Sequence, residues 1–264
     1  MTGLVEPLVS LALDGSVARV TIGSGERRNA LTSGGWAGIE HAMRALASDA
    51  ELRVAVIEGE ASWFSAGSDI REWVEATPDE VDLSFVRMEA ACTAIEAMPV
   101  PVIAKVRGPA AGAGCQLALA CDMRVLAADA SIGMPIARLG ILVSPSFANR
   151  LTAHAGASVA REMLYTGRMV GAEEAVRLGL ANACVRGDEL DHHVDRLITA
   201  ILRSSDAAVR AAKQAVDLVE SPGRTAALTA PAGPRVMQRD FKRGVNAFVR
   251  RRRARTVKTA RRAG

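Results

Sequence analysis

Apolar residues recur with a period of two at the beginning of the chain. Residues 8–13 and 17–22 are rich in leucine, valine and isoleucine, and they flank the pair Asp14-Gly15. An Asp-Gly pair between two such runs favours a tight turn, because glycine readily adopts positive φ angles. The pattern predicts that the chain begins with a β-hairpin.

Helical and extended patterns then alternate along the chain. Thr32 can cap a helix whose apolar side chains recur every three or four positions, whereas residues 54–57 form a short apolar run typical of a buried strand. The same criteria predict helices over residues 32–46, 78–98, 115–121, 147–154, 158–165, 172–180, 190–203, 206–220 and 234–253, and strands over residues 54–57, 100–106, 123–127, 131–134 and 183–185. The recurring order of strand, small-residue turn and helix indicates an α/β fold.

Composition describes a globular chain with a basic end. Of its 264 residues 49% are hydrophobic, which is enough for a sizeable core. We expect a boundary near Ser204-Ser205, between a core over residues 1–204 and a helical segment over residues 205–264. Twelve lysines and arginines stand against one acid, Asp240, in residues 235–264, although the net charge of the whole chain is only +4. Such an end attracts phosphate groups, whether of a cofactor, a membrane surface or nucleic acid.

Several classes of protein do not fit the sequence. The four cysteines are scattered without a C-x-x-C pair, so neither a disulfide framework nor a zinc site is expected. We find no N-terminal targeting pattern and no apolar run long enough for a membrane span, and therefore expect a cytoplasmic protein. Aromatic residues make up only 3% of the chain, and the arginines have no stacking platform or recognition motif beside them, which argues against nucleic-acid binding.

Two turns of small residues carry the candidate chemistry. The first is the stretch from Trp63 to Glu72, in which Gly67 lies between small residues, and the second, ending at Gly114, precedes a predicted helix. Main-chain N–H groups at such positions lack partners within the helix and can bind an anion. We expect the N–H groups of Ala66 and Ala113 to converge on one oxygen as an oxyanion hole, which stabilises charge on a carbonyl. Neither turn has a G-x-G-x-x-G or P-loop pattern, so neither indicates nucleotide binding.

Four motifs together resemble the enoyl-CoA hydratase/isomerase (crotonase) family. They are R-R-N-A-L, F-S-A-G-S-D-I-R-E, V-R-G-P-A-A-G-A-G-C-Q-L-A-L-A-C-D and G-M-P-I-A-R-L-G-I, and the similarity extends to Phe248-Val249-Arg250-Arg251. The resemblance implies a crotonase-like spiral of ββα units with a helical C-terminal segment that forms a homotrimer, usually paired into a hexamer. It implies an acyl-CoA thioester as the partner, with coenzyme A as part of the substrate and no separate cofactor or metal.

The resemblance also places substrate-binding residues. It implies that Arg28, Ser68, Asp69 and Ile70 lie along the coenzyme A path. The last helix of the family reaches the coenzyme A of a neighbouring subunit, so Arg251 and the arginines beside it could contact its phosphates.

The sequence departs from the family at both usual catalytic glutamates. Their positions hold Gln116 and Ile136. Hydration of a double bond needs one group to take a proton and another to supply one, and neither an amide nor an alkyl side chain does so. Standard hydration and isomerisation are therefore doubtful, whereas polarisation of a thioester carbonyl is retained.

Several other side chains could take part in catalysis or binding, and each of them could instead have an ordinary structural role. Asp69 can cap its helix, Asp122 can accept backbone hydrogen bonds, and Arg138 can bind either a substrate carboxylate or a surface acid. His154 can interact with a helix C-terminus, Tyr165 can belong to the core, and Ser144, Ser146 and Asn149 can face an acyl group. We therefore expect a crotonase-family enzyme that stabilises a thioester enolate, and keep open a non-catalytic acyl-CoA binding protein and a nucleic-acid-binding basic end.

Overall fold

A computed structural model of the chain describes residues 2–6, 8–25 and 27–220. The chain forms two compact units, Met1–Arg203 and Ser204–Gly264. The described part of the second unit includes helix α7 (Asp206–Glu220), at the predicted position. The helix predicted over residues 234–253, the basic end and Arg251 lie outside the described residues, so the oligomerisation and phosphate-binding roles expected of them stay predictions.

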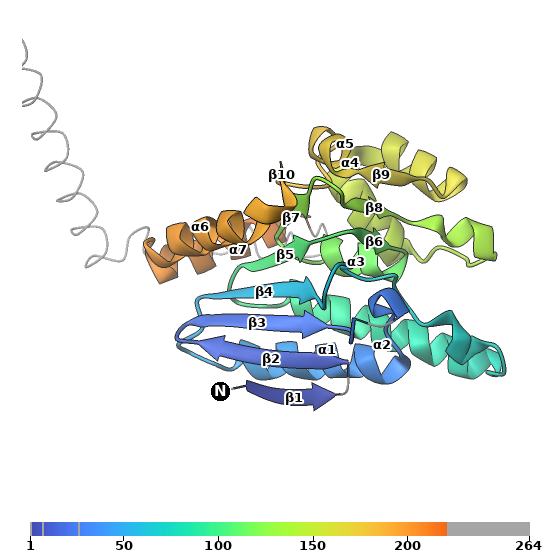
Figure 1. The fold of residues 1–264 in the computed structure, drawn as a ribbon, viewed down its shortest axis with the longest axis horizontal. Helices are drawn as coiled ribbons and strands as arrows, with labels where there is room; N and C mark the ends of the chain where they lie inside the picture. Colours follow the sequence, from blue (N-terminus) through green and yellow to red (C-terminus); the bar gives the residue numbers. More distant parts are fainter. Residues whose placement is uncertain (1, 7, 26, 221–264) are drawn as a thin grey trace, which may run out of the picture. The chain divides into compact units, whose positions relative to one another are not determined.

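The first unit is built on a sheet with the strand order β1-β2-β3-β4-β5-β7-β10 (Figure 1). Its strands are β1 (Thr2–Glu6), β2 (Val9–Asp14), β3 (Val17–Ile22), β4 (Val54–Gly59), β5 (Val102–Val106), β7 (Met123–Ala127) and β10 (Ala183–Val185). β2 and β3 form the predicted hairpin, and every pairing from β3 to β10 is parallel. β1 was not predicted, because its short run of mixed residues has no clear period.

Helices connect the parallel strands. The first unit contains α1 (Ser33–Ala47), α2 (Pro78–Glu96), α3 (Ala113–Leu119), α4 (Pro145–Thr166), α5 (Ala172–Arg177) and α6 (Leu190–Leu202). Thr32 caps α1 as predicted, since its hydroxyl accepts a hydrogen bond from the Gly35 N–H at 3.1 Å. α2 begins with a capping box between Thr77 and Glu80. The alternation of strands and helices confirms an α/β fold.

α4 joins the two helices predicted over residues 147–154 and 158–165. Gly156 interrupts it with a φ of 76° and a ψ of 162°, a conformation that L side chains rarely adopt. The glycine that separated the two predicted helices therefore marks a break within one element.

A small second sheet has the order β6-β8-β9. β6 (Pro109–Ala111) lies inside the second small-residue turn, β8 (Ser131–Gly133) was predicted, and β9 (Met169–Gly171) was not. Proline and alanine carry little strand signal, so β6 could not be distinguished from a turn by its composition. This sheet holds the second turn in place, because the Gly112 N–H donates to the Gly133 carbonyl at 2.8 Å.

The core consists mainly of aliphatic side chains from the main sheet and from the helices that pack on it. Trp36 and Phe64 are its largest aromatic members, and both are fully buried. All four cysteines are free, as expected; burial raises the pKa of the Cys92 and Cys115 thiols to about 12. Across the part of the chain that the structure describes, no helix combines the length and apolar character needed to cross a bilayer.

Candidate active site

The two small-residue turns lie side by side. The Ser65 N–H donates to the Pro109 carbonyl at 3.2 Å, and the Ala111 N–H donates to the Ser65 carbonyl at 2.9 Å. These bonds form an isolated parallel bridge between Ser65 and Ala110. The first turn is therefore joined to β6, the strand that leads into the second turn.

Glycine is required where the turns meet. Gly67 has a φ of 91°, and a Cβ atom there would lie 2.8 Å from both the Ala111 carbonyl oxygen and the Ala113 nitrogen. A Cβ atom on Gly114 would lie 2.3 Å from the Ser65 carbonyl oxygen. Since real Cβ contacts are longer than this, any side chain at either position would push the turns apart.

The structure contradicts the expectation that Ala66 supplies a free donor. The Ala66 N–H donates to the Arg28 carbonyl at 2.9 Å, so this amide is already paired inside the protein. The Arg28 carbonyl reaches it because Arg27, Arg28 and Asn29 all adopt positive φ angles, a turn that the sequence did not reveal.

Two other main-chain amides at the turns differ from that of Ala66. Among the described residues, nothing accepts a hydrogen bond from the Ser68 N–H or from the Ala113 N–H. Ala113 begins α3, and its N-cap residue, Gly112, has a φ of 57° and no capping side chain. Amides in the first turn of a helix have no intrahelical acceptor, which explains why the one at Ala113 is available.

Asn29 organises the first turn, although the sequence analysis did not single it out. Its side chain is 1% exposed; Nδ2 donates to the Glu60 and Trp63 carbonyls, both at 2.7 Å, and Oδ1 accepts from the Gly25 N–H at 2.9 Å. Ser65 continues this network, because its hydroxyl donates to the Asn29 carbonyl at 2.8 Å and accepts from the Gly67 N–H at 3.0 Å. The asparagine of R-R-N-A-L was the available signal, since asparagine tolerates the left-handed region.

The residues expected along the coenzyme A path surround the first turn. The Arg28 guanidinium lies 4.9 Å from the centre of the Trp63 ring. The Ser68 hydroxyl accepts a hydrogen bond from the indole N–H of Trp36 at 3.1 Å, and Ile70 is half exposed. Arg28 and Ser68 therefore both contact tryptophan side chains at this turn.

Asp69 is the N-cap of a short 3₁₀ helix, η2 (Ile70–Trp73), as the alternative reading predicted. Its carboxylate accepts from the Arg71 N–H at 3.2 Å and pairs with the Arg71 and Arg27 side chains at 2.9 and 3.2 Å. The hydrogen bond from the Arg71 side chain is the main reason that the pKa of Asp69 lies below its ordinary value. These contacts make Asp69 a structural carboxylate.

Gln116 and Ile136, which stand at the positions of the family's two usual glutamates, flank the second turn and are both uncharged. Gln116 is fully buried; its Nε2 lies 3.4 Å from the Phe147 carbonyl oxygen, and its Oε1 accepts from Arg150 Nη1 at 3.4 Å. Ile136, 6% exposed, lies in η3 (Pro135–Leu139), and its Cγ2 is 4.0 Å from where a Cβ on Gly112 would stand. An amide that is already hydrogen-bonded and an alkyl group therefore border the turn.

The remaining candidates have mostly structural contacts. Asp122 accepts from the Val102 N–H at 2.6 Å, as expected. Arg138 Nη2 donates to the Thr166 carbonyl at 3.3 Å, at the end of α4. Tyr165 is 75% exposed, so the prediction that it belongs to the core is wrong. Other apolar residues of α4 are buried in the core, whereas Tyr165 is not. Ser144 caps α4, and its hydroxyl lies 2.9 Å from that of Ser146.

His154 contacts the end of α3 rather than that of its own helix. Its Nε2 lies 3.1 Å from the carbonyl oxygen of Leu119, the last residue of α3. Burial, with the nearby charge of Arg124, lowers the pKa of His154 to about 4. A neutral imidazole that donates to this carbonyl is a link between α3 and α4.

Comparisons with known proteins agree with the fold and the motifs. The family model described as enoyl-CoA hydratase/isomerase matches residues 13–256. A crotonyl-CoA hydratase of Syntrophomonas wolfei is 34% identical over 230 residues, which cover 86% of this chain and 88% of that protein. A short-chain-enoyl-CoA hydratase of Clostridium acetobutylicum is 31% identical over 210 residues, 79% of this chain and 80% of the relative.

Solved structures give the same result. An enoyl-CoA hydratase/carnithine racemase from Magnetospirillum magneticum superimposes with a TM-score of 0.83 at 26% identity, covering 95% of this chain and 94% of the other. An enoyl-CoA hydratase from Bacillus anthracis gives a TM-score of 0.79 at 25% identity, with 92% and 96% covered. The predicted crotonase-like architecture is thereby confirmed, and the chain belongs to the enoyl-CoA hydratase/isomerase family.

Proposed function

We propose that the protein is an enzyme that binds an acyl-CoA thioester and stabilises its enolate. The observation that carries this proposal is the pair of amides, Ser68 N–H and Ala113 N–H, that have no acceptor among the described residues at two turns in direct contact. Two such donors on one thioester oxygen form the oxyanion hole, with Ser68 in place of the expected Ala66. Removing one oxyanion donor typically costs about 10²–10³-fold in rate.

The reaction of this protein is not the hydration that a pair of glutamates catalyses. Gln116 and Ile136 provide no carboxylate beside the second turn, so neither water activation nor α-carbon protonation follows the usual route. The alkyl side chain of Ile136 suits an apolar acyl group. Polarisation of the thioester carbonyl makes the α-hydrogens acidic. With no carboxylate beside the turn, solvent water takes the α-proton as the enolate forms and returns a proton to the α-carbon.

Coenzyme A would lie against the first turn. Arg28, stacked near Trp63, offers a cation and an aromatic face for the nucleotide part, beside Ser68 and Ile70. We further propose a homotrimer or hexamer in which Arg251 of one subunit contacts coenzyme A phosphates of the next. Sedimentation velocity with and without acyl-CoA tests the assembly, and a monomer would contradict it.

Exchange of the α-hydrogens of butyryl-CoA in D₂O, followed by NMR, tests the enzyme proposal. The wild type should catalyse exchange, and Ala113→Pro should lose about 10²-fold, because proline removes the N–H yet fits the first position of a helix. Ala172→Pro is the matched control: Ala172 also begins a helix, α5, and also follows a glycine. Equal exchange by both variants, with their folds intact, would refute the proposal.

A non-catalytic acyl-CoA binding protein is the second candidate. The hydrogen-bonded amide of Gln116 and the alkyl group of Ile136 favour it, because no described side chain beside the second turn is free to move a proton. It predicts that butyryl-CoA binds without α-exchange and that a panel of acyl-CoA esters shows no turnover. Exchange above background with any of them would exclude it.

A further inference from the structure

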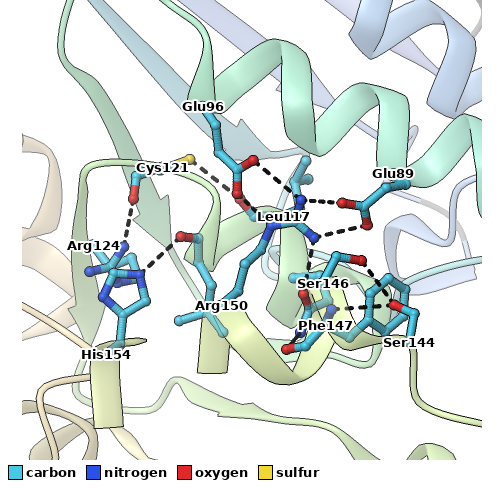
Figure 2. Close-up of polar contacts among 12 residues, drawn as sticks. Glu89, Glu96, Leu117, Cys121, Arg124, Ser144, Ser146, Phe147, Arg150 and His154 are labelled. Carbon is cyan, nitrogen blue, oxygen red and sulfur yellow. Dashed lines mark hydrogen bonds and ion pairs between the residues drawn. The ribbon is translucent and has the colours of Figure 1, made fainter. Parts of the chain in front are cut away.

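A buried arginine lies behind the second turn. Arg150 extends from α4, its side chain is 7% exposed, and it pairs with two carboxylates of α2 (Figure 2). Glu89 accepts from Nη2 at 2.5 Å and from Nη1 at 3.0 Å, and Glu96 accepts from Nε at 2.5 Å and from Nη2 at 3.3 Å. Burial lowers the pKa of Arg150, but these hydrogen bonds outweigh burial and raise it, so the guanidinium stays charged.

The remaining guanidinium hydrogen is directed at Gln116. A guanidinium has five N–H donors; Glu89 and Glu96 accept four hydrogen bonds, and Gln116 Oε1 accepts the fifth, from Nη1 at 3.4 Å. On its other side, Gln116 Nε2 faces the Phe147 carbonyl oxygen at 3.4 Å and Met134 Sδ at 3.5 Å. Because a guanidinium only donates and a carbonyl only accepts, the orientation of this amide is determined.

A neutral group fits position 116, and an ionised carboxylate does not. The charged groups around it are Arg150 on α4 and, beyond it, Glu89 and Glu96 on α2; the nearby Cys92 thiol has a pKa of about 12 and is neutral. A carboxylate would be a third negative charge near one cation, and one of its oxygens would face the Phe147 carbonyl oxygen without a proton between them. A protonated carboxyl group would reproduce both hydrogen bonds of the amide.

Gln116 also connects Arg150 with the oxyanion hole. It lies three residues after Ala113 in the first turns of α3, a helix of seven residues whose N-cap has no side chain. Its amide contacts α4 through Arg150 and Phe147. A displacement of Arg150 would therefore displace Gln116 and, with it, the N-terminus of α3.

We propose that Arg150 is the positioning residue of this site: it holds Gln116 as a neutral amide and, through it, sets the position of the Ala113 N–H. The site is thus built to work without a carboxylate at position 116. The part that concerns Ala113 rests on the proposed function, whereas the part that concerns the neutral amide does not.

The first test is the pH dependence of stability in Gln116→Glu, measured by urea unfolding. The variant should be close to the wild type at about pH 5 and increasingly less stable towards about pH 8. The reason is that a folded-state pKa raised above the unfolded value stabilises the protein only while the group is protonated. Gln116→Met, which cannot titrate, should differ from the wild type by the same amount at every pH.

The opposite trend would overturn the proposal. If Gln116→Glu gains stability relative to the wild type as the pH rises, then Arg150 accepts a third carboxylate and position 116 is not built for a neutral group. Titration of the variant's ¹³Cδ-labelled glutamates by NMR gives the same distinction, with one glutamate resonance expected to titrate roughly two pH units above the ordinary glutamate value of about 4.3.

The second test compares binding of butyryl-CoA with binding of coenzyme A by calorimetry. Gln116→Met and Arg150→Met should each weaken butyryl-CoA about tenfold and leave coenzyme A unchanged, because only the thioester contacts the amide at Ala113. Arg150→Lys should restore part of the loss. Arg168→Met is the control, since Arg168 also pairs with two glutamates, Glu162 and Glu174, on another part of the unit.

The outcomes separate the two proposals. Unchanged butyryl-CoA affinity in Gln116→Met, the variant that leaves the Arg150 ion pairs in place, would refute the positioning role. If the wild type binds neither ligand, the proposed function fails, and the pH dependence of Gln116→Glu still decides whether position 116 is built for a neutral group.

Discussion

The two turns of the site are supported by networks of different chemistry. Behind the first turn, the neutral side chain of Asn29 binds backbone carbonyls and one backbone amide. Behind the second, the charged side chain of Arg150 binds two carboxylates and one amide side chain. The first network therefore holds main chain directly, whereas the second acts on main chain only through Gln116.

This difference decides how each network should respond to change. Asn29 itself is 1% exposed, so loss of its donors leaves the two carbonyls facing a buried position without a hydrogen-bond partner. The carboxylates that Arg150 binds are partly exposed, 32% for Glu89 and 42% for Glu96, so water can replace part of what is lost. We expect the neutral network to matter more for stability and the charged one to matter more for the position of α3.

The largest effect is expected where the two turns touch. Gly114→Ala places a methyl group 2.3 Å from the Ser65 carbonyl oxygen, so the backbone of one turn must move. We expect a loss of about 4 kcal/mol in the free energy of unfolding, measured with urea. Gly171→Ala, where a Cβ meets nothing within 4 Å, should change it by less than about 1 kcal/mol. Similar losses in the two variants would contradict the contact between the turns.

Asn29→Asp removes the donors of the first network. An aspartate cannot donate to the Glu60 and Trp63 carbonyls, so we expect a loss of about 3 kcal/mol. The same urea measurement on Asn149→Asp provides the control, because Asn149 makes no side-chain hydrogen bond among the described residues. A loss below that of the control would show that this network does not hold the turn.

Arg150→Met removes the cation of the second network. Breaking a buried ion pair costs about 3–5 kcal/mol, but the exposure of both glutamates should reduce the loss to about 2 kcal/mol. The value is measured beside Asn29→Asp under identical conditions. A larger loss for Arg150→Met than for Asn29→Asp would reverse the comparison.

The smallest effect concerns His154, the other polar link between α3 and α4. Its pKa falls from 6.5 to about 4 on folding, so the unfolded chain takes up a proton first and stability is lost as the pH falls from about 6.5 towards 4. After allowance for its partial exposure, we expect about 1 kcal/mol at about pH 5 relative to His154→Gln, which can donate to the Leu119 carbonyl but cannot titrate. Parallel stability curves for the two proteins would show that burial does not disfavour the charged imidazole.

The elements with a regular period could be predicted from the sequence, and so could the two small-residue turns of the site. Val17–Ile22 and Ser33–Ala47 carry clear patterns because one face of each is buried. β6 and β9 could not be predicted, since each has only three residues and neither shows a period. Pairing between distant segments fixes them, and that information is absent from a local pattern.

The site was predicted in part for the same reason. Gly67 and the glycines around Ala113 located the two turns, but which amides remain unpaired depends on a turn at residues 27–29 with three positive φ angles. That turn pairs the Ala66 N–H with the Arg28 carbonyl. The bridge between Leu31 and Ser68 uses the Gly67 carbonyl and the Asp69 N–H, so the Ser68 N–H has no acceptor among the described residues. Arg150 lies 34 residues from Gln116 in sequence, so no spacing rule connects them.

The most direct test of the oxyanion hole is the carbonyl stretching frequency of bound butyryl-CoA, recorded by infrared difference spectroscopy with a ¹³C-labelled thioester. Hydrogen bonds from Ser68 N–H and Ala113 N–H should lower this frequency relative to the free ester in the wild type and in Ala172→Pro. Ala113→Pro should return most of the shift towards the free value. An unshifted carbonyl in the bound wild-type complex, or a shift that Ala113→Pro leaves unchanged, would contradict the account.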